Sequence, residues 1–226
     1  MYEFSIMSTS NPDIKKFPDA ALQRYVETQI LPQYRAFDKA HQEDHARKVI
    51  EESLKLAAHY DVDVRMVYTV AAYHDLGLVE GRETHHIVSG KILMADNELK
   101  KYFTVDELIT MKNAIEDHRA SSDHEPRSLY GRIVAEADRD IEPMRILRRT
   151  VQYGLSRFPE KNHDEQYARF VSHLHEKYAE GGYLKLWIPE SGNAAQLSAL
   201  RDIIRDEEAL KACFERIYME ETTTGG

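Results

Sequence analysis

Hydrophobic residues recur at helical spacing along most of the chain, and alternation with a period of two is scarce. The segment 64–73, VRMVYTVAAY, is apolar on most faces and therefore predicts a central, buried helix. The segment 44–60 carries Val49, Ile50 and Leu54 on one stripe, as in a helix that buries a single face. We therefore predict an all-α fold, a single-domain helical bundle.

Helix boundaries follow from capping residues and helix breakers. A first helix is predicted over 19–30, with Asp19 as its N-cap and Pro32 ending it. Gly77 offers a left-handed C-cap to the central helix. The same periodicity predicts later helices over 83–95, 105–118, 129–141, 143–154, 164–179 and 194–218.

The predicted helical domain spans 19–220. A partly disordered N-terminal extension, 1–18, is predicted to precede it, and a flexible tail, 221–226, to follow. The polar segment 121–127 contains Pro126 and predicts a loop. The segment 181–189 starts with two glycines and predicts a second loop, which we expect to act as a lid over the functional site.

Composition narrows the function classes. The formal charge is −9 without a basic stripe, which argues against a long nucleic-acid partner. No apolar run approaches the roughly 20 residues of a membrane span. The N-terminus lacks the pattern of a signal peptide, and the single cysteine, Cys213, suits a reducing compartment, so a cytoplasmic location is expected. A homo-oligomer is compatible with these features.

The segment 71–77, AAYHDLG, contains the strongest candidates for metal-binding residues. The side chains of His74 and Asp75 are expected to lie near apolar residues at the end of the predicted central helix. An ionised carboxylate in such surroundings needs a partner. A divalent cation is one solution, because it binds carboxylate and neutral imidazole together. The alternative is that the two residues cap the helix end or pair with each other. Further candidates at or near predicted helix ends are His45, His85, His86, His118 and Asp138.

The order of His45, the His74-Asp75 pair and the distant Asp138 resembles the HD superfamily of metal-dependent phosphohydrolases, over less than half of the chain. The segment 86–90, HIVSG, is similar to the H-x-x-x-G that follows the HD pair in many members. The resemblance implies a metal core over about 40–142, completed by C-terminal helices over 143–220. It implies a first metal on His45, His74, Asp75 and Asp138, and a second on Asp75, His86 and His118.

Two of these assignments have competitors. His85 competes with His86, and the downstream Gly90 favours His86. Asp140 could replace Asp138, or Glu136 could assist it. The cofactor is expected to be one or two divalent metals per chain, with Mn, Fe, Ni, Zn and Mg not distinguished.

The resemblance implies hydrolysis of a phosphate ester or anhydride in a small molecule, with a nucleotide as the favoured substrate. A metal-bound hydroxide would attack phosphorus. Asp75, Glu80 and Arg119 are the predicted catalytic residues, and Glu116, Asp117 and Glu136 are other carboxylates that could move the proton. Phosphate oxygens are predicted to bind Arg82, Lys91, Arg119 and Arg139.

The chain departs from some subfamilies. No lysine follows the HD pair within 76–80, and the GYP motif of cyclic-dinucleotide phosphodiesterases is absent. Two other functions fit the same residues: a two-iron oxygenase that uses this ligand set, and a non-catalytic sensor that binds a nucleotide.

Overall fold

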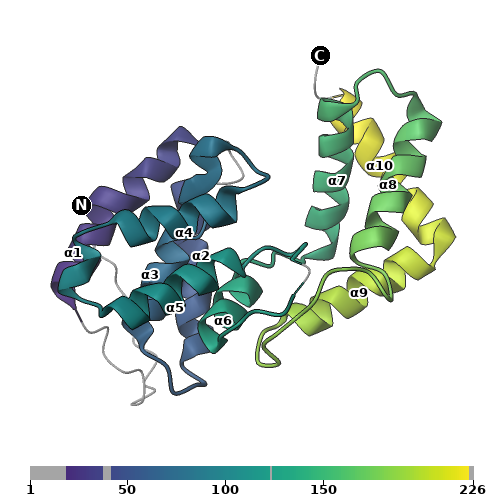
Figure 1. Cartoon of the computed structure of the whole chain (residues 1–226). Helices are drawn as coiled ribbons and strands as arrows, with labels where there is room; N and C mark the ends of the chain where they lie inside the picture. Colours follow the sequence, from purple (N-terminus) through teal and green to yellow (C-terminus); the bar gives the residue numbers. More distant parts are fainter. Residues whose placement is uncertain (1–18, 38–41, 123, 224–226) are drawn as a thin grey trace.

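The computed structural model describes residues 19–37, 42–122 and 124–223, which are largely helical and contain no β-strand (Figure 1). The all-α prediction is confirmed. The α-helices within these ranges are α1 Ala20–Tyr25, α2 Glu43–Ala57, α3 Val64–Tyr73, α4 His85–Ala95, α5 Val105–Glu116, α6 Leu129–Ala137, α7 Pro143–Arg157, α8 His163–Lys177, α9 Asn193–Arg205 and α10 Glu207–Thr223. None of these helices combines the length and the apolar character of a membrane span. The predictions for 1–18 and 224–226 concern residues outside the described ranges.

Helix α3 is the centre of a first group of helices, α1 to α6. Every residue of 66–73 is buried, and α3 contacts α2, α5 and α6. The side chain of Asp63 begins the helix by accepting a hydrogen bond from the backbone N–H of Arg65. His74 follows directly as the C-cap. The His74-Asp75 pair therefore lies at the C-terminal end of α3, the most buried helix of this group.

The N-terminal helical segment does not end before Pro32, so that prediction is wrong. After α1 it continues through a π-helical turn, Val26–Ile30, and a 3-10 stretch, Leu31–Ala36. Pro32 lies in the first turn of that stretch, where the missing N–H is not needed. The continuation buries Tyr34, whose hydroxyl donates to the carbonyl oxygen of Ala72 at 3.0 Å.

Helices α7 to α10 form a second group with an apolar core of their own, and Figure 1 shows them standing apart from α1 to α6. Leu147, Phe170 and Phe214 lie in this core and are almost completely buried. Helix α8 begins with a capping box, in which Asn162 and Glu165 satisfy each other's backbone N–H groups. Helix α10 extends to Thr223, so it includes 221–223, the first residues of the predicted tail.

Residues 183–192, called the strap below, lead from the end of α8 to α9 and pack against the first group on the way. Ile188 is buried in a cluster with Ile133 of α6. The carboxylate of Glu136, also on α6, is fully buried. It accepts hydrogen bonds from Trp187 N (2.6 Å), Ile188 N (3.4 Å), Ser191 Oγ (2.5 Å) and Asn193 Nδ2 (2.9 Å). The C-terminal half of the predicted lid, 181–189, is thus anchored to α6.

Replacing Glu136 with alanine is expected to lower the free energy of unfolding by about 3 kcal/mol, because the buried and partly buried donors of the strap would lose their acceptor. Urea unfolding followed by circular dichroism measures this. The matched control is Glu52→Ala, which removes a carboxylate from a partly exposed position on α2 that pairs with Lys55; its expected cost is below about 0.5 kcal/mol. Equal costs for the two variants would contradict the anchoring role of Glu136.

Candidate metal centre

Six histidine and aspartate side chains meet where helices of the first group begin or end. They are His45 in the first turn of α2, His74 and Asp75 after α3, His85 at the start of α4, His118 just beyond α5 and Asp138 just beyond α6. Their candidate ligand atoms fall into two groups of three, and within each group all atoms lie within 4.8 Å of one another. Helix ends thus converge on one site, as in other helical bundles that hold metals.

The first group of candidate ligands consists of His45, His74 and Asp138. The Nε2 atom of His45 lies 3.3 Å from Nε2 of His74 and 3.2 Å from Oδ1 of Asp138. Two imidazole lone pairs that face each other at such a distance repel, unless a proton or a cation lies between them. Two neutral imidazoles with a carboxylate are a donor set that suits a divalent transition metal.

The second group of candidate ligands consists of Asp75, His85 and His118. The Nε2 atoms of His85 and His118 are 3.2 Å apart. Oδ1 of Asp75 lies 3.4 Å from Nε2 of His85 and 3.5 Å from Nε2 of His118. The donor set is again two imidazoles with one carboxylate oxygen, and it fits a second cation of the same kind.

Asp75 faces both groups of candidate ligands and turns one carboxylate oxygen toward each of them. Its Oδ2 lies 3.3 Å from Nε2 of His74 and 3.7 Å from Nε2 of His45, on the side of the first group. Its Oδ1 points to the second group. The side chain is only 6% exposed, so water screens its negative charge little. A carboxylate in this position can bridge two cations.

Backbone carbonyls fix the orientation of three of the histidine rings. The Nδ1 atoms of His74, His85 and His118 lie 2.7, 2.8 and 2.6 Å from the carbonyl oxygens of Ala71, Arg82 and Ile115. A carbonyl oxygen only accepts, so each Nδ1 carries the hydrogen. When the ring is neutral, each Nε2 is then left with a lone pair that points into the cluster, which is the tautomer that a metal ligand needs.

The structure brings His85 into the second group and not His86, which corrects the choice made from the sequence. Adjacent residues on a helix point about 100° apart, so only one of the two can face Asp75. Nδ1 of His86 is buried without a hydrogen-bond partner among the described residues. Gly90 serves helix packing instead: a Cβ there would lie 3.1 Å from the Lys112 side chain on α5.

Gly77 has a different role from the predicted left-handed cap, since its φ is not positive. A Cβ at this position would lie 2.1 Å from the carbonyl oxygen of His85 and 2.6 Å from the N atom of Ser89. The backbone N–H of Gly77 donates to the Ser89 hydroxyl at 2.8 Å. The turn after Asp75 can therefore approach α4 closely, which brings His85 next to the carboxylate.

The charges of the cluster shift the pKa values of its members. Burial lowers the pKa of His74, but Asp75 and Asp138 outweigh burial and raise it to about 9. Burial raises the pKa of Asp138, yet the hydrogen bond from His45 and the charge of His74 hold it at about 2. Burial and the neighbouring His118 lower the pKa of His85 to about 4. The metal-free cluster thus binds a proton at His74 near neutral pH.

Metal affinity is expected to rise with pH from about pH 7 to about pH 9. A metal binds neutral imidazole, so below the raised pKa of His74 it has to displace a proton, and the affinity gains about tenfold per pH unit. Above that pKa the gain ends. The pKa of His85, about 4, adds nothing in this interval. Chelator competition at a series of pH values measures the dependence, and a constant affinity over the interval would contradict it.

The other predicted catalytic and substrate-binding residues lie in different surroundings. Glu80, Arg82 and Lys91 are exposed. Arg119 donates from Nη1 to the carbonyl oxygen of Glu83 at 2.8 Å. Arg139 lies beside the cluster: its side chain is 6% exposed, and Nη1 is 3.7 Å from Oδ2 of Asp138. Arg139 thus pairs with a candidate metal ligand, and the roles of the other three cations stay predictions.

Two of the carboxylates considered for proton transfer hold α5 and the following loop in place. Glu116 pairs with Lys112 at 2.6 Å and with Arg127 at 3.0 Å. Asp117 is buried and accepts from the backbone N–H of Arg127 at 2.7 Å. Both are committed to structural pairs, as Glu136 is to the strap.

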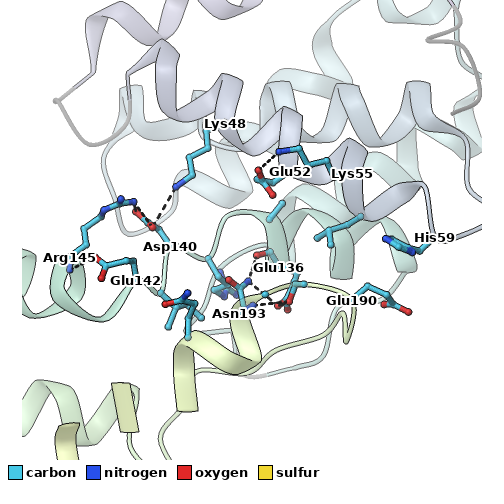
Figure 2. Close-up of a pocket in the computed structure, with 17 residues that line it drawn as sticks. Lys48, Glu52, Lys55, His59, Glu136, Asp140, Glu142, Arg145, Glu190 and Asn193 are labelled. Carbon is cyan, nitrogen blue, oxygen red and sulfur yellow. Dashed lines mark hydrogen bonds and ion pairs between the residues drawn. The ribbon is translucent and has the colours of Figure 1, made fainter. Parts of the chain in front are cut away.

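A polar cleft of about 460 Å³ lies between α2, the α6–α7 turn and the start of α9 (Figure 2). Asp140 lies in this cleft, 3.5 Å from Nζ of Lys48 and 2.7 Å from Nη1 of Arg145. It belongs to neither group of candidate ligands. Of the acidic residues near the end of α6, only Asp138 does, so the geometry favours Asp138 over Asp140 and Glu136.

Sequence reasoning missed the support that Tyr34 gives to the central pair. Its hydroxyl accepts a hydrogen bond from the backbone N–H of Asp75 at 3.3 Å and donates to Ala72. The side chain is fully buried, and burial together with the charge of Asp75 raises the pKa of the phenol well above its usual value. Tyr34 lies in a segment predicted to follow the end of a helix, so no local pattern pointed to it.

Residues 43–142 match the family model described as the HD domain. No curated protein and no solved structure matches the chain significantly. The matched range contains all six side chains of the two groups.

Proposed function

Since residues 43–142 form an HD domain, we propose that this protein is a metal-dependent hydrolase that cleaves a phosphate ester or anhydride in a small molecule, with a nucleotide as the favoured substrate. The position of Asp75 carries this proposal. Its two carboxylate oxygens face two separate groups, each with two imidazoles. This arrangement suits a pair of cations rather than a single one.

Divalent cations in the two groups would acidify water and stabilise the charge of the phosphoryl oxygens. The residues of the chain supply the rest. The backbone carbonyls behind His74 and His118 keep both rings in the ligand tautomer. His74 is fully buried and His118 nearly so, whereas His45 and Asp138 remain about a fifth exposed, at 23% and 22%. Substrate therefore reaches the centre from the side of His45 and Asp138.

Arg139 lies next to that opening and provides a fixed positive charge. Its Nη1 donates to the carbonyl oxygen of His118 at 3.1 Å, which holds the guanidinium at the centre. A buried guanidinium binds phosphate oxygens strongly, because water does not compete for it. We assign to Arg139 the role of orienting the phosphate of the substrate.

The test is a hydrolysis assay on purified protein loaded separately with Mn, Fe, Ni, Zn or Mg. The substrates are nucleoside mono- and triphosphates and sugar phosphates, and the readout is release of phosphate or pyrophosphate. Turnover with at least one metal, lost in Asp75→Asn, is the expected result. Metal-loaded protein without turnover of any of them would overturn the proposal, and oxygen consumption by the iron form would point to the two-iron oxygenase.

A further inference from the structure

A second pocket, of about 390 Å³, lies next to the second group of candidate ligands, and His86 and Arg119 line it. In the sequence, each of these two residues directly follows a candidate ligand of that group, His85 or His118. The ring of His86 contacts the ring of His85, with centroids 5.5 Å apart. Ligand pockets in proteins have volumes of roughly 300 to 1,000 Å³, so this pocket can hold a phosphate group and part of the molecule that carries it.

The positive charge of Arg119 is not paired with a carboxylate in the described part of the chain. Its Nη1 donates to the backbone carbonyl oxygen of Glu83 at 2.8 Å, and this acceptor carries no net charge. The acidic side chain among the described residues of this pocket is Glu116. It is bound to two other cations, Lys112 at 2.6 Å and Arg127 at 3.0 Å. Arg119 therefore remains as the charge that an anion in the pocket can pair with.

His86 lacks the hydrogen bond that fixes the neighbouring histidines. Nδ1 of His85 and Nδ1 of His118 are each held by a backbone carbonyl oxygen, whereas Nδ1 of His86 is buried without a partner among the described residues. An unpaired polar atom in the interior costs free energy and is uncommon, so a histidine at this position serves a purpose other than stability. With its hydrogen on Nε2, the ring can donate to an anion in the pocket.

The turn after α5 adds two hydroxyl groups to the pocket, those of Ser121 and Ser122. The backbone N–H of Ser122 donates to the carbonyl oxygen of Arg119 at 3.1 Å, which keeps the turn next to the arginine. Neither hydroxyl donates a hydrogen bond to another residue in the described part of the chain. The pocket thus offers guanidinium, imidazole and hydroxyl donors together, and phosphate oxygens accept from all three.

We propose that Arg119, His86 and the two serines of this turn form a phosphate-binding site beside the second group of candidate ligands. Arg139 does not line this pocket, so the site is additional to the phosphate contact assigned to Arg139. The group that it binds is a second phosphoryl group of the substrate or free phosphate, which share the same binding chemistry. The first of these sources rests on the proposed function, and it makes compounds with two or more phosphoryl groups the preferred substrates.

The test compares Arg119→Gln and Arg132→Gln with the wild type, each as the full chain, loaded with metal and freed of excess metal. Arg132 is an exposed arginine of α6 that pairs with Glu125 at 3.5 Å and does not line the pocket, so the control removes the same charge from a nearby element. The probe is inorganic phosphate, followed by isothermal titration calorimetry. Arg119→Gln is expected to weaken phosphate binding by about tenfold, the value of one charge-assisted hydrogen bond, and Arg132→Gln by less than about twofold.

His86→Phe is the second variant, because it keeps a ring beside His85 and leaves the hydrogen bond between Arg119 and the turn before α4 in place. It is expected to weaken phosphate binding by about fivefold. Without phosphate, its melting temperature is expected to equal or exceed that of the wild type, because the buried unpaired nitrogen is gone. Metal content, measured in parallel, is expected to stay at the value of the wild type in both variants.

Three results would overturn the site. The first is unchanged phosphate affinity in Arg119→Gln, and the second is an equal loss of affinity in Arg119→Gln and Arg132→Gln. The third is a loss of phosphate affinity that only accompanies a loss of metal, because the phosphate would then be bound by the metals.

Kinetics separate the two sources of the anion, and either kinetic result supports the site. For a phosphoryl group of the substrate, the ratio of KM for a nucleoside triphosphate to KM for the monophosphate is expected to rise about tenfold in Arg119→Gln. For free phosphate, this ratio stays constant and inhibition by added phosphate weakens. If no phosphorylated compound is hydrolysed but Arg119→Gln and His86→Phe still lose phosphate affinity, the site stands and the proposed function fails.

Discussion

Replacing Asp75 with alanine is expected to empty both metal positions and to abolish hydrolysis. Each oxygen of this carboxylate faces one pair of imidazoles, and no other carboxylate among the described residues belongs to the second group. Without it, Nε2 of His85 and Nε2 of His118 face each other with no negative charge between them. Activity is expected to fall by about a thousandfold or more, which is the scale of lost electrostatic stabilisation of a transition state.

Mass spectrometry of the metals in purified protein measures the first effect, and the phosphate-release assay measures the second. Asp140→Ala is the matched control, because it removes a carboxylate two residues beyond Asp138 that is engaged with Lys48 and Arg145. The control is expected to retain its metals. If Asp75→Ala kept the metal content of the wild type, Asp75 would not be a ligand and the two groups would have another purpose.

Exchanging His85 for alanine is expected to leave about one metal per chain, whereas His86→Ala is expected to retain about two. The two residues are neighbours on α4 and have the same chemistry, so each variant is the control for the other. Only His85 approaches Asp75, with Nε2 at 3.4 Å from Oδ1, and its ring is held by the carbonyl oxygen of Arg82.

The same metal analysis decides between the neighbours. Loss of the second metal in His86→Ala, with His85→Ala unaffected, would reverse the assignment. Loss in both variants would indicate that His86 also contributes to the site, for example through its ring contact with His85, whose centroid is 5.5 Å away.

The sequence predicts the helices of this fold well where one pattern dominates. The apolar residues of α3 predict a buried helix, and the structure confirms it. Asp63, near which this helix was predicted to begin, is its N-cap in the structure. Prediction failed at Pro32, because the residue starts a tighter helical stretch instead of ending the helix. The separate apolar core of α7 to α10 was not predicted either, since amphipathic stripes do not reveal which helices share a core.

The candidate ligands His45, His74, Asp75, His118 and Asp138 could be named from spacing and from a resemblance, and the structure brings all five together. The choice between adjacent histidines depends on the rotation of α4, which is set by contacts of Gly77 and Gly90 with distant backbone and side chains. The role of Glu136 depends on how the strap packs against α6. Such contacts between distant segments leave no local pattern.

The central claim is that Asp75 lies between two metals, and anomalous diffraction from crystals grown with manganese tests it most directly. Two anomalous peaks are predicted, about 3.5–4 Å apart, one among His45, His74 and Asp138 and the other between His85 and His118, with Asp75 touching both. A single peak that Asp75 does not contact, or no peak within the cluster at full metal loading, would contradict the account.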